Sequence, residues 1–112
     1  MRRNYLGEFE EIVLLICAQL GNEAYGVSIT EAIHGQTGRN VTISAIHATL
    51  SRLEKKGLLN SHMGGVTKER GGRRKRFFTI TLYGIQILNE VLELRQQLWQ
   101  RIPSVVLKWK TI

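Results

Sequence analysis

Residues 71–80 read GGRRKRFFTI, in which two glycines precede four basic residues and an apolar alternation. This pattern is typical of a charged β-hairpin tip that leads into a half-buried strand. A helix is expected just upstream, from Thr42 to Lys56, with a short uncharged polar side at its start and basic residues at its end. A short helix beside a basic hairpin predicts a winged helix-turn-helix, and therefore a DNA-binding protein.

The charge of the chain agrees with this interpretation. The 112 residues carry a formal net charge of +7, and this length suits one small domain with a modest core. Basic residues crowd the range 68–76, whereas acids gather near both ends. A surface of one sign attracts polyanions, although solubility alone could also account for the charge. Membrane binding is disfavoured because the basic residues surround a glycine turn and do not follow an amphipathic helix.

Cysteine and histidine chemistry is not expected. Cys17 is the single cysteine and lies in the apolar run 12–18, where it is typical of a small core side chain in a reducing compartment. His34, His47 and His62 have no thiol or carboxylate companions at metal-site spacing. We therefore expect no metal and no cofactor.

Membrane, targeting and catalytic signals are also missing from the sequence. No segment is long and apolar enough to span a bilayer, and the start of the chain has acids soon after Arg2 and Arg3, unlike a signal peptide. The glycines do not form the phosphate-binding pattern G-x-x-x-x-G-K-[ST], and no nucleophile stands in a strand-turn-helix elbow. We expect a cytoplasmic protein that is not an enzyme.

The expected order of elements is helix, helix, helix, hairpin, helix. The expected helices run from about Leu6 to Leu20, from Tyr25-Gly26 to just before Gly38, from an N-cap at Thr42 to a C-cap at Gly57, and from an N-cap at Thr81 to about Arg101, before Pro103. The expected strands are 58–61 and 76–81, joined through Gly64-Gly65 and Gly71-Gly72. The fold class is thus mainly α with a small β-hairpin.

The third helix has two distinct faces. Ile43, Ile46, Leu50 and Leu53 fall on one narrow arc, which is expected to face the core. The small side chains of the opposite arc could enter a major groove, while its basic residues could reach phosphates. An ordinary solvent-facing helix would look similar, so the groove interpretation depends on the basic hairpin. The predicted DNA-binding residues are Thr42, Ser44, Ala45, Ala48, Ser51, Arg52, Lys55, Lys68, Arg70, Arg73, Arg74, Lys75 and Arg76.

The last helix has two apolar stripes, roughly 115° apart on the helix surface. One stripe is formed by Ile85, Leu88, Leu92 and Trp99, and the other by Ile87, Val91, Leu94 and Leu98. A helix that packs only on its own domain needs one stripe, so the second is expected to face a partner in a C₂ dimer. A larger internal core is the alternative.

Five segments of the chain occur together in a specific order. They are Leu6-Gly7-Glu8-Phe9, Tyr25-Gly26 and the ranges 50–59, 69–78 and 80–84. In this combination the chain resembles the PadR family of transcriptional regulators, from its start to about Trp99. The resemblance implies a bacterial, homodimeric winged-helix repressor that dimerises through the C-terminal helix with help from the first. The predicted dimer contacts are Phe9, Ile87, Val91, Leu94, Leu98 and Trp99.

Two positions depart from the family pattern. The family commonly has Tyr where this chain has His47, which lies near the edge of the core arc and could be a packing residue. The tail after Pro103 is short, Ser104 to Ile112. Some relatives bind flat aromatic or lipophilic inducers at the dimer interface, where Trp99 could stack on a ligand or simply anchor the partner.

The expected function is that of a homodimeric, sequence-specific DNA-binding regulator, a repressor on an inverted-repeat operator. Residues 1–81 would form the winged helix-turn-helix domain, and residues 82–112 the dimerisation helix and short tail. Besides an inducer-responsive regulator, the alternatives are a protein-interaction adaptor with a winged-helix fold and a double-stranded RNA binder. The RNA interpretation is disfavoured because a helix cannot enter the deep, narrow major groove of A-form RNA.

Overall fold

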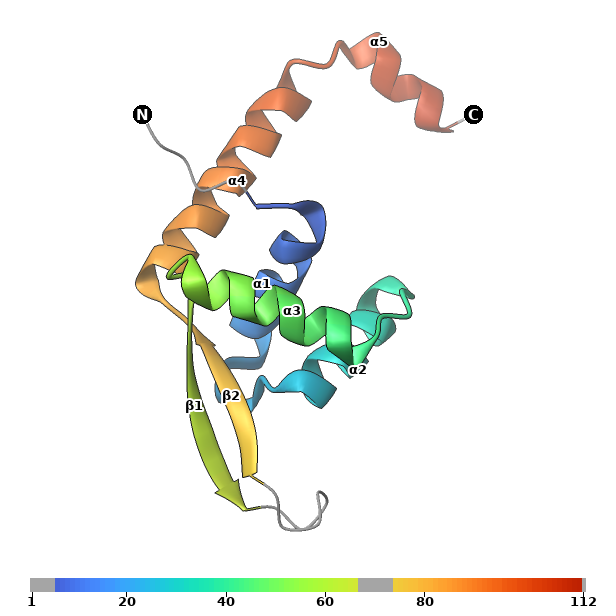
Figure 1. Ribbon diagram of the computed structural model, residues 1–112. Helices are drawn as coiled ribbons and strands as arrows, with labels where there is room; N and C mark the ends of the chain where they lie inside the picture. Colours follow the sequence, from blue (N-terminus) through green and yellow to red (C-terminus); the bar gives the residue numbers. More distant parts are fainter. Residues whose placement is uncertain (1–5, 67–73, 112) are drawn as a thin grey trace.

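Three helices pack together beside a two-stranded hairpin, and a fourth helix extends away from them (Figure 1). The computed structural model describes residues 6–66 and 74–111. The elements are α1 (Glu8–Leu20), η1 (Gly21–Glu23), α2 (Gly26–Thr37), α3 (Ile43–Lys55), β1 (Leu59–Val66), β2 (Arg74–Ile80), α4 (Leu82–Gln100), α5 (Ser104–Leu107) and η3 (Lys108–Thr111). The predicted mainly α class with one antiparallel hairpin is confirmed.

The core lies where α1, α2, α3 and the base of the hairpin meet. Apolar side chains of each element recur at the spacing of one helical face or one strand face, so they turn inward together. The buried apolar residues are Val13, Leu14, Ile16, Cys17, Ala24, Ile29, Ile33, Ile46, Leu50, Leu53, Leu58, Leu59, Phe78 and Ile87. Burial raises the pKa of the Cys17 thiol to about 12, so this thiol is a core group, as its apolar surroundings predicted.

Both threonine N-caps are confirmed. Thr42 Oγ1 accepts a hydrogen bond from the Ala45 amide at 3.1 Å, and Thr81 Oγ1 accepts one from the Gly84 amide at 2.9 Å. These bonds satisfy amides that a first helical turn leaves without a partner. The third helix ends slightly earlier than predicted, because Lys56 is its C-cap and Gly57 follows with a φ of 81°.

The hairpin is longer than the sequence predicted. Its strands pair from Leu59↔Ile80 to Met63↔Arg76. The register then shifts, and pairing resumes at Val66↔Arg74. The prediction that Gly64 belongs to the turn was therefore wrong. A Cβ at Gly64 would overlap the ring of Phe77, so this glycine lets the ring cover the strand. The turn prediction failed because glycine also occurs within strands, where it allows another group to approach the backbone closely.

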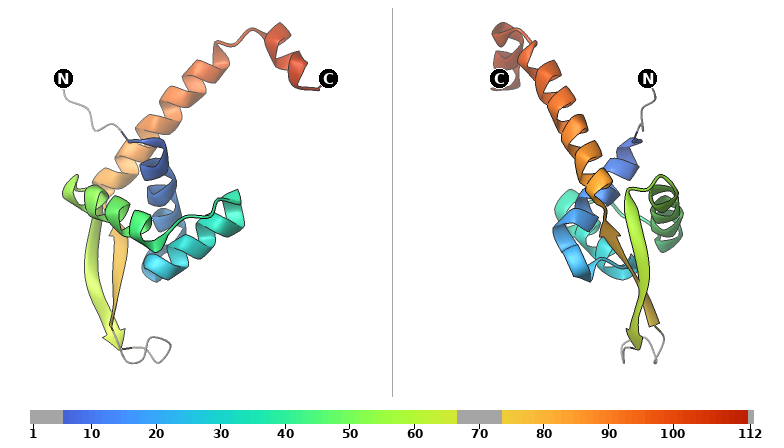
Figure 2. Two further views of the ribbon diagram at one scale, coloured as in Figure 1. Left: turned by 45° about the vertical axis from the view of Figure 1, so that its right-hand side comes forward. Right: turned by 90° about the vertical axis from the view of Figure 1, so that its left-hand side faces the viewer.

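The last helix begins directly on the hairpin and then leaves the body of the domain (Figure 2). Its first turn approaches the hairpin closely at Gly84, where a Cβ would lie 2.5 Å from the Leu58 carbonyl oxygen and 2.7 Å from Ile80 Cγ1. Only a residue without a side chain fits at this distance. Gly84 therefore sets how closely α4 approaches the domain.

We predict that Gly84→Ala lowers the free energy of unfolding by about 1–3 kcal/mol, because the added methyl group meets a backbone oxygen that cannot easily move. Gly35→Ala is the matched control, since Gly35 lies within α2 and a Cβ there would meet nothing within 4 Å. The control should raise the free energy of unfolding by roughly 0.5–1 kcal/mol. Urea unfolding followed by circular dichroism measures both, and equal stability of the two variants would contradict the packing argument.

Candidate nucleic-acid interface

The third helix is anchored by one buried face. Ile46, Leu50 and Leu53 are fully buried, as predicted, and Thr49 joins them at 2% exposure. The prediction for Ile43 was wrong, because its side chain is 44% exposed. Ile43 lies in the first turn of α3, whereas the buried residues begin at Ile46. The helical period predicts which face of a helix turns toward the core, but it does not predict which turns of the helix reach the core.

The other face of α3 is open to solvent, as its polar and small side chains predicted. The predicted DNA-binding residues that lie on or beside α3 and are exposed are Thr42, Ser44, Ala45, Ala48, Ser51, Arg52 and Lys55. His47 is exposed as well, so it does not belong to the core. A helix with small residues at its start and cations toward its end can approach base edges closely while its end meets phosphates.

A buried carboxylate holds α3 against α1. Glu10 is only 7% exposed, and it accepts hydrogen bonds from Arg52 Nε at 3.2 Å, Lys56 Nζ at 2.9 Å and the Gly7 amide at 2.9 Å. Burial raises the pKa of the Glu10 carboxyl, but the three donors outweigh burial, so the pKa lies below its usual value. Arg52, which the sequence placed on the groove face, is therefore also a structural partner of α1.

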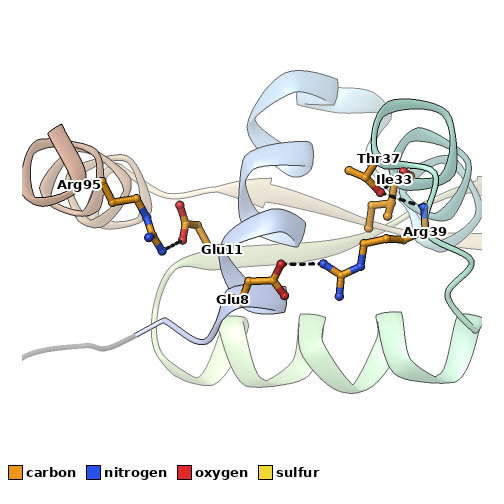
Figure 3. A network of polar contacts seen from close by, with 6 residues as sticks. All are labelled: Glu8, Glu11, Ile33, Thr37, Arg39 and Arg95. Carbon is orange, nitrogen blue, oxygen red and sulfur yellow. Dashed lines mark hydrogen bonds and ion pairs between the residues drawn. The ribbon is translucent and has the colours of Figure 1, made fainter. Parts of the chain in front are cut away.

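Two further acids of the same helical turn bind cations from other elements (Figure 3). Glu8 Oε2 lies 2.8 Å from Arg39 Nη1, between α2 and α3, and Glu11 Oε1 lies 2.7 Å from Arg95 Nη2 on α4. Sequence reasoning noted these acids only as part of the charge balance. Their partners are far away along the chain, so no local pattern could have named them.

The hairpin cations that the structure describes lie on β2. Arg74 Nε donates to the Gly64 carbonyl oxygen at 2.8 Å, and Arg76 Nη1 donates to Ser61 Oγ at 3.0 Å. Lys75 Nζ lies 4.1 Å from the centroid of the Tyr25 ring. Three predicted contact residues, Lys68, Arg70 and Arg73, lie outside the described residues.

The third helix, the start of α2 and the hairpin meet around a cavity of about 250 Å³. It is lined by Tyr25, Gly26, Val27, Ile43, His47, Met63 and the three cations Arg74, Lys75 and Arg76. The structure thus brings the predicted hairpin cations next to the start of the predicted reading helix. The two parts of the site lie on elements that are separate in sequence, α3 and β2, and line the same cavity.

The two stripes of α4 are placed differently from the prediction. Ile87 is 5% exposed and Val91 packs against the core, so these two residues of the predicted partner-facing stripe serve their own domain. Ile85 and Leu92, expected to face the domain, are exposed. They line a groove of about 300 Å³ between α1 and α4, together with Leu15 and Leu88. Leu88, also expected to face the domain, does pack against the core, so the inward face of α4 takes residues from both predicted stripes.

The last part of α4 carries the remaining predicted dimer residues. Leu94, Leu98 and Trp99 are 50%, 58% and 60% exposed. Phe9 of α1 is half-buried, and Arg39 lies over its ring with its Cζ atom 5.5 Å from the ring centroid. A row of large apolar side chains in water is typical of an interaction surface.

Within residues 6–66 and 74–111, no group of three or more His, Cys, Asp or Glu side chains could hold a metal ion. No helix among these residues is long and apolar enough to cross a membrane.

Three packed helices followed by a basic antiparallel hairpin define a winged helix-turn-helix, a class in which the third helix and the hairpin form the surface for DNA. A family model described as "Transcriptional regulator PadR-like family" matches residues 13–90. The chain belongs to this family. It is therefore a DNA-binding transcriptional regulator and not an enzyme.

Individual relatives agree with the family. An uncharacterized protein of Lysinibacillus sphaericus is 30% identical over 102 residues, which cover 89% of this chain and 85% of the relative. The fold is similar to that of a PadR-like transcription factor from Bacteroides fragilis, with a TM-score of 0.71 at 20% identity, covering 82% and 84% of the two chains. A transcriptional regulator from Clostridium thermocellum is similar with a TM-score of 0.64 at 26% identity, covering 88% and 89%.

We predict that Glu10→Gln lowers the free energy of unfolding by about 1–3 kcal/mol at neutral pH, because a neutral amide cannot replace a charged acceptor for two cations. The pKa of Glu10 is lower in the folded than in the unfolded protein, so its stabilisation is present above the ordinary value of 4.5 and is lost as the pH falls through the folded-state pKa. The difference in the free energy of unfolding between wild type and variant, the stability gap, should therefore shrink below pH 4.5.

Urea unfolding at neutral pH and in acid measures this gap. Glu31→Gln is the control, since Glu31 is exposed on α2, and it should change the free energy of unfolding by less than about 0.5 kcal/mol. A gap between wild type and Glu10→Gln that stayed constant into acid would show that the charge of Glu10 does not stabilise the fold.

Proposed function

We propose that this regulator is a homodimer that represses transcription by binding an inverted-repeat operator, with one α3 in each half-site. The observation that carries the proposal is the surface shared by α3 and β2. Ser44, Ala45 and Ala48 are small and exposed, and the cations of β2 line the same cavity as His47 of α3. A helix that enters a major groove needs little bulk at its start, and adjacent cations suit the flanking phosphates.

In this proposal α3 selects the sequence and the hairpin supplies general attraction. The hydroxyl of Ser44 can bond a base edge, whereas an arginine on the exposed part of a strand meets phosphates, which are the same in every sequence. Arg52 would reach a phosphate while its Nε remains near Glu10, since its side chain is 54% exposed.

The dimer would form through α4, and residues 82–112 would serve mainly this purpose. Leu94, Leu98 and Trp99 are exposed and apolar, and the groove beside α1 continues this surface toward the domain. In a dimer with a twofold axis, a second copy of α4 would cover this surface. Two reading helices held at a fixed distance then require an inverted repeat, with half-site centres about 34–36 Å apart or a multiple of this.

We predict that Leu98→Asp converts the dimer to a monomer, because it places a carboxylate within the proposed apolar interface. Gln100→Asp adds the same charge at the last residue of α4, about 160° around the helix axis from Leu98 at 100° per residue, and is the control. Sedimentation gives the mass of each variant, and titration with duplexes carrying the full repeat or a single half-site gives the affinity. Wild type and control should prefer the full repeat, whereas Leu98→Asp should bind both duplexes weakly and alike. If Leu98→Asp remains dimeric, the C-terminal part of α4 does not belong to the dimer interface.

We predict opposite signatures for Arg74→Ala and Ser44→Ala. Arg74→Ala should weaken operator and random DNA equally and make the slope of log affinity against log salt shallower by about 0.9, the value for one lost phosphate contact. Ser44→Ala should leave this slope unchanged and reduce the preference for the operator by about 1 kcal/mol. Fluorescence anisotropy at several salt concentrations measures both. Loss of specificity in Arg74→Ala with an unchanged slope would mean that the hairpin reads bases.

A further inference from the structure

The cavity between α2, α3 and the hairpin contains an imidazole among cations. His47 of α3 lies against the first turn of α2, so closely that a Cβ at Gly26 would be 2.9 Å from its Nε2 atom. Glycine at this position therefore leaves room for the ring. The ring is exposed, and the cavity beside it is about 250 Å³ in volume, which is enough for several water molecules or a small anionic group.

Each element around this cavity contributes side chains to its lining. The start of α2 contributes the Tyr25 phenol, β1 contributes the uncharged Met63, and β2 contributes Arg74, Lys75 and Arg76. No carboxylate lines the cavity among the residues that the structure describes. Arg76 is linked to an acid through Ser61 Oγ, which donates to Glu54 Oε2 at 2.7 Å.

An anion suits the lining of this cavity, because its charged side chains among the described residues are Arg74, Lys75 and Arg76. A cavity whose charged lining is entirely basic attracts negative charge, and a phosphate oxygen accepts hydrogen bonds from arginine, lysine and protonated histidine. The apolar lining side chains Val27, Ile43 and Met63 suit the sugar that follows a phosphate in DNA. The cavity also lies between the helix and the strand that the proposed function places on DNA.

We propose that this cavity binds one backbone phosphate of DNA and that His47 is a proton-dependent contact to it, so that the protein binds DNA more tightly as the pH falls. The inference rests on the proposed orientation of α3 and the hairpin on DNA. Histidine changes its charge between about pH 5 and pH 8. The phosphate favours the protonated imidazole, so binding takes up a proton, and by linkage a lower pH strengthens binding.

The test compares wild type with His47→Gln, which keeps a polar side chain but cannot become a cation. Anisotropy titrations of an operator duplex at about pH 6 and about pH 8, each at several salt concentrations, give affinity and salt slope. Wild type should bind about fivefold more tightly at the lower pH, as for one exposed ionic contact. Its salt slope should also be steeper there by about 0.9, whereas both quantities should be independent of pH in His47→Gln.

Two further variants separate this contact from other titrations. His34→Gln is the matched control, since His34 is exposed at the far end of α2, and it should keep the pH dependence of wild type. His47→Lys carries a permanent charge and should show the steeper slope at both pH values. A pH dependence that persists in His47→Gln would overturn the inference, and so would its loss in His34→Gln.

The outcomes also distinguish this inference from the proposed function. If wild type binds the operator with a salt-dependent affinity that does not change with pH, the role of His47 is wrong while the proposed function stands. If wild type binds no duplex at either pH, both fail. Inorganic phosphate replacing chloride at constant ionic strength should leave the NMR signals of His47 unchanged. Saturable shifts at millimolar phosphate would assign the cavity to a free anion and overturn its assignment to the DNA backbone.

Discussion

The orientation of α3 on the core depends on a single buried charge. Glu10 is nearly inaccessible to water, and a carboxylate in such a place is stable only when its oxygens are satisfied. Two of its donors, Arg52 and Lys56, belong to the last part of α3 and its C-cap. Any rotation or shift of α3 would leave this charge without partners, which is costly, so the ion pair holds the helix in one orientation on the core.

The same helical turn connects α3 to the rest of the molecule. Glu8 binds Arg39 just before α3, and Glu11 binds Arg95 on α4. These two pairs are more exposed than that of Glu10 and contribute less free energy each. Their geometry is nevertheless informative, because α1 contacts both the helix that would read DNA and the helix that would meet a partner. In the proposed dimer, the distance between the two reading helices would depend on this turn.

Three glycines determine how closely the remaining elements approach. Gly84 brings α4 onto the hairpin, Gly64 makes room for Phe77 on β1, and Gly26 admits the ring of His47 against α2. At each position a side chain would meet a neighbouring atom at 2.9 Å or less. None of the three has a positive φ, so glycine is required there for space and not for an unusual backbone conformation. Gly26 and His47 both line the cavity between α2, α3 and the hairpin.

The sequence by itself determined the order of the four long helices and the hairpin, the threonine caps at Thr42 and Thr81 and the solvent face of α3, because each depends on residues within a few positions of one another. It also determined the family, through five short segments in a fixed order. The short helices η1, α5 and η3 were not predicted. Tertiary structure alone decided the partners of Glu10, which are 42 and 46 residues away, and the exposure of Ile43. It also decided which residues of the two α4 stripes face the core, and it placed His47 beside the cations of β2. These features arise where two elements approach each other, and the distance and rotation of that approach are set by packing, which a local pattern does not contain.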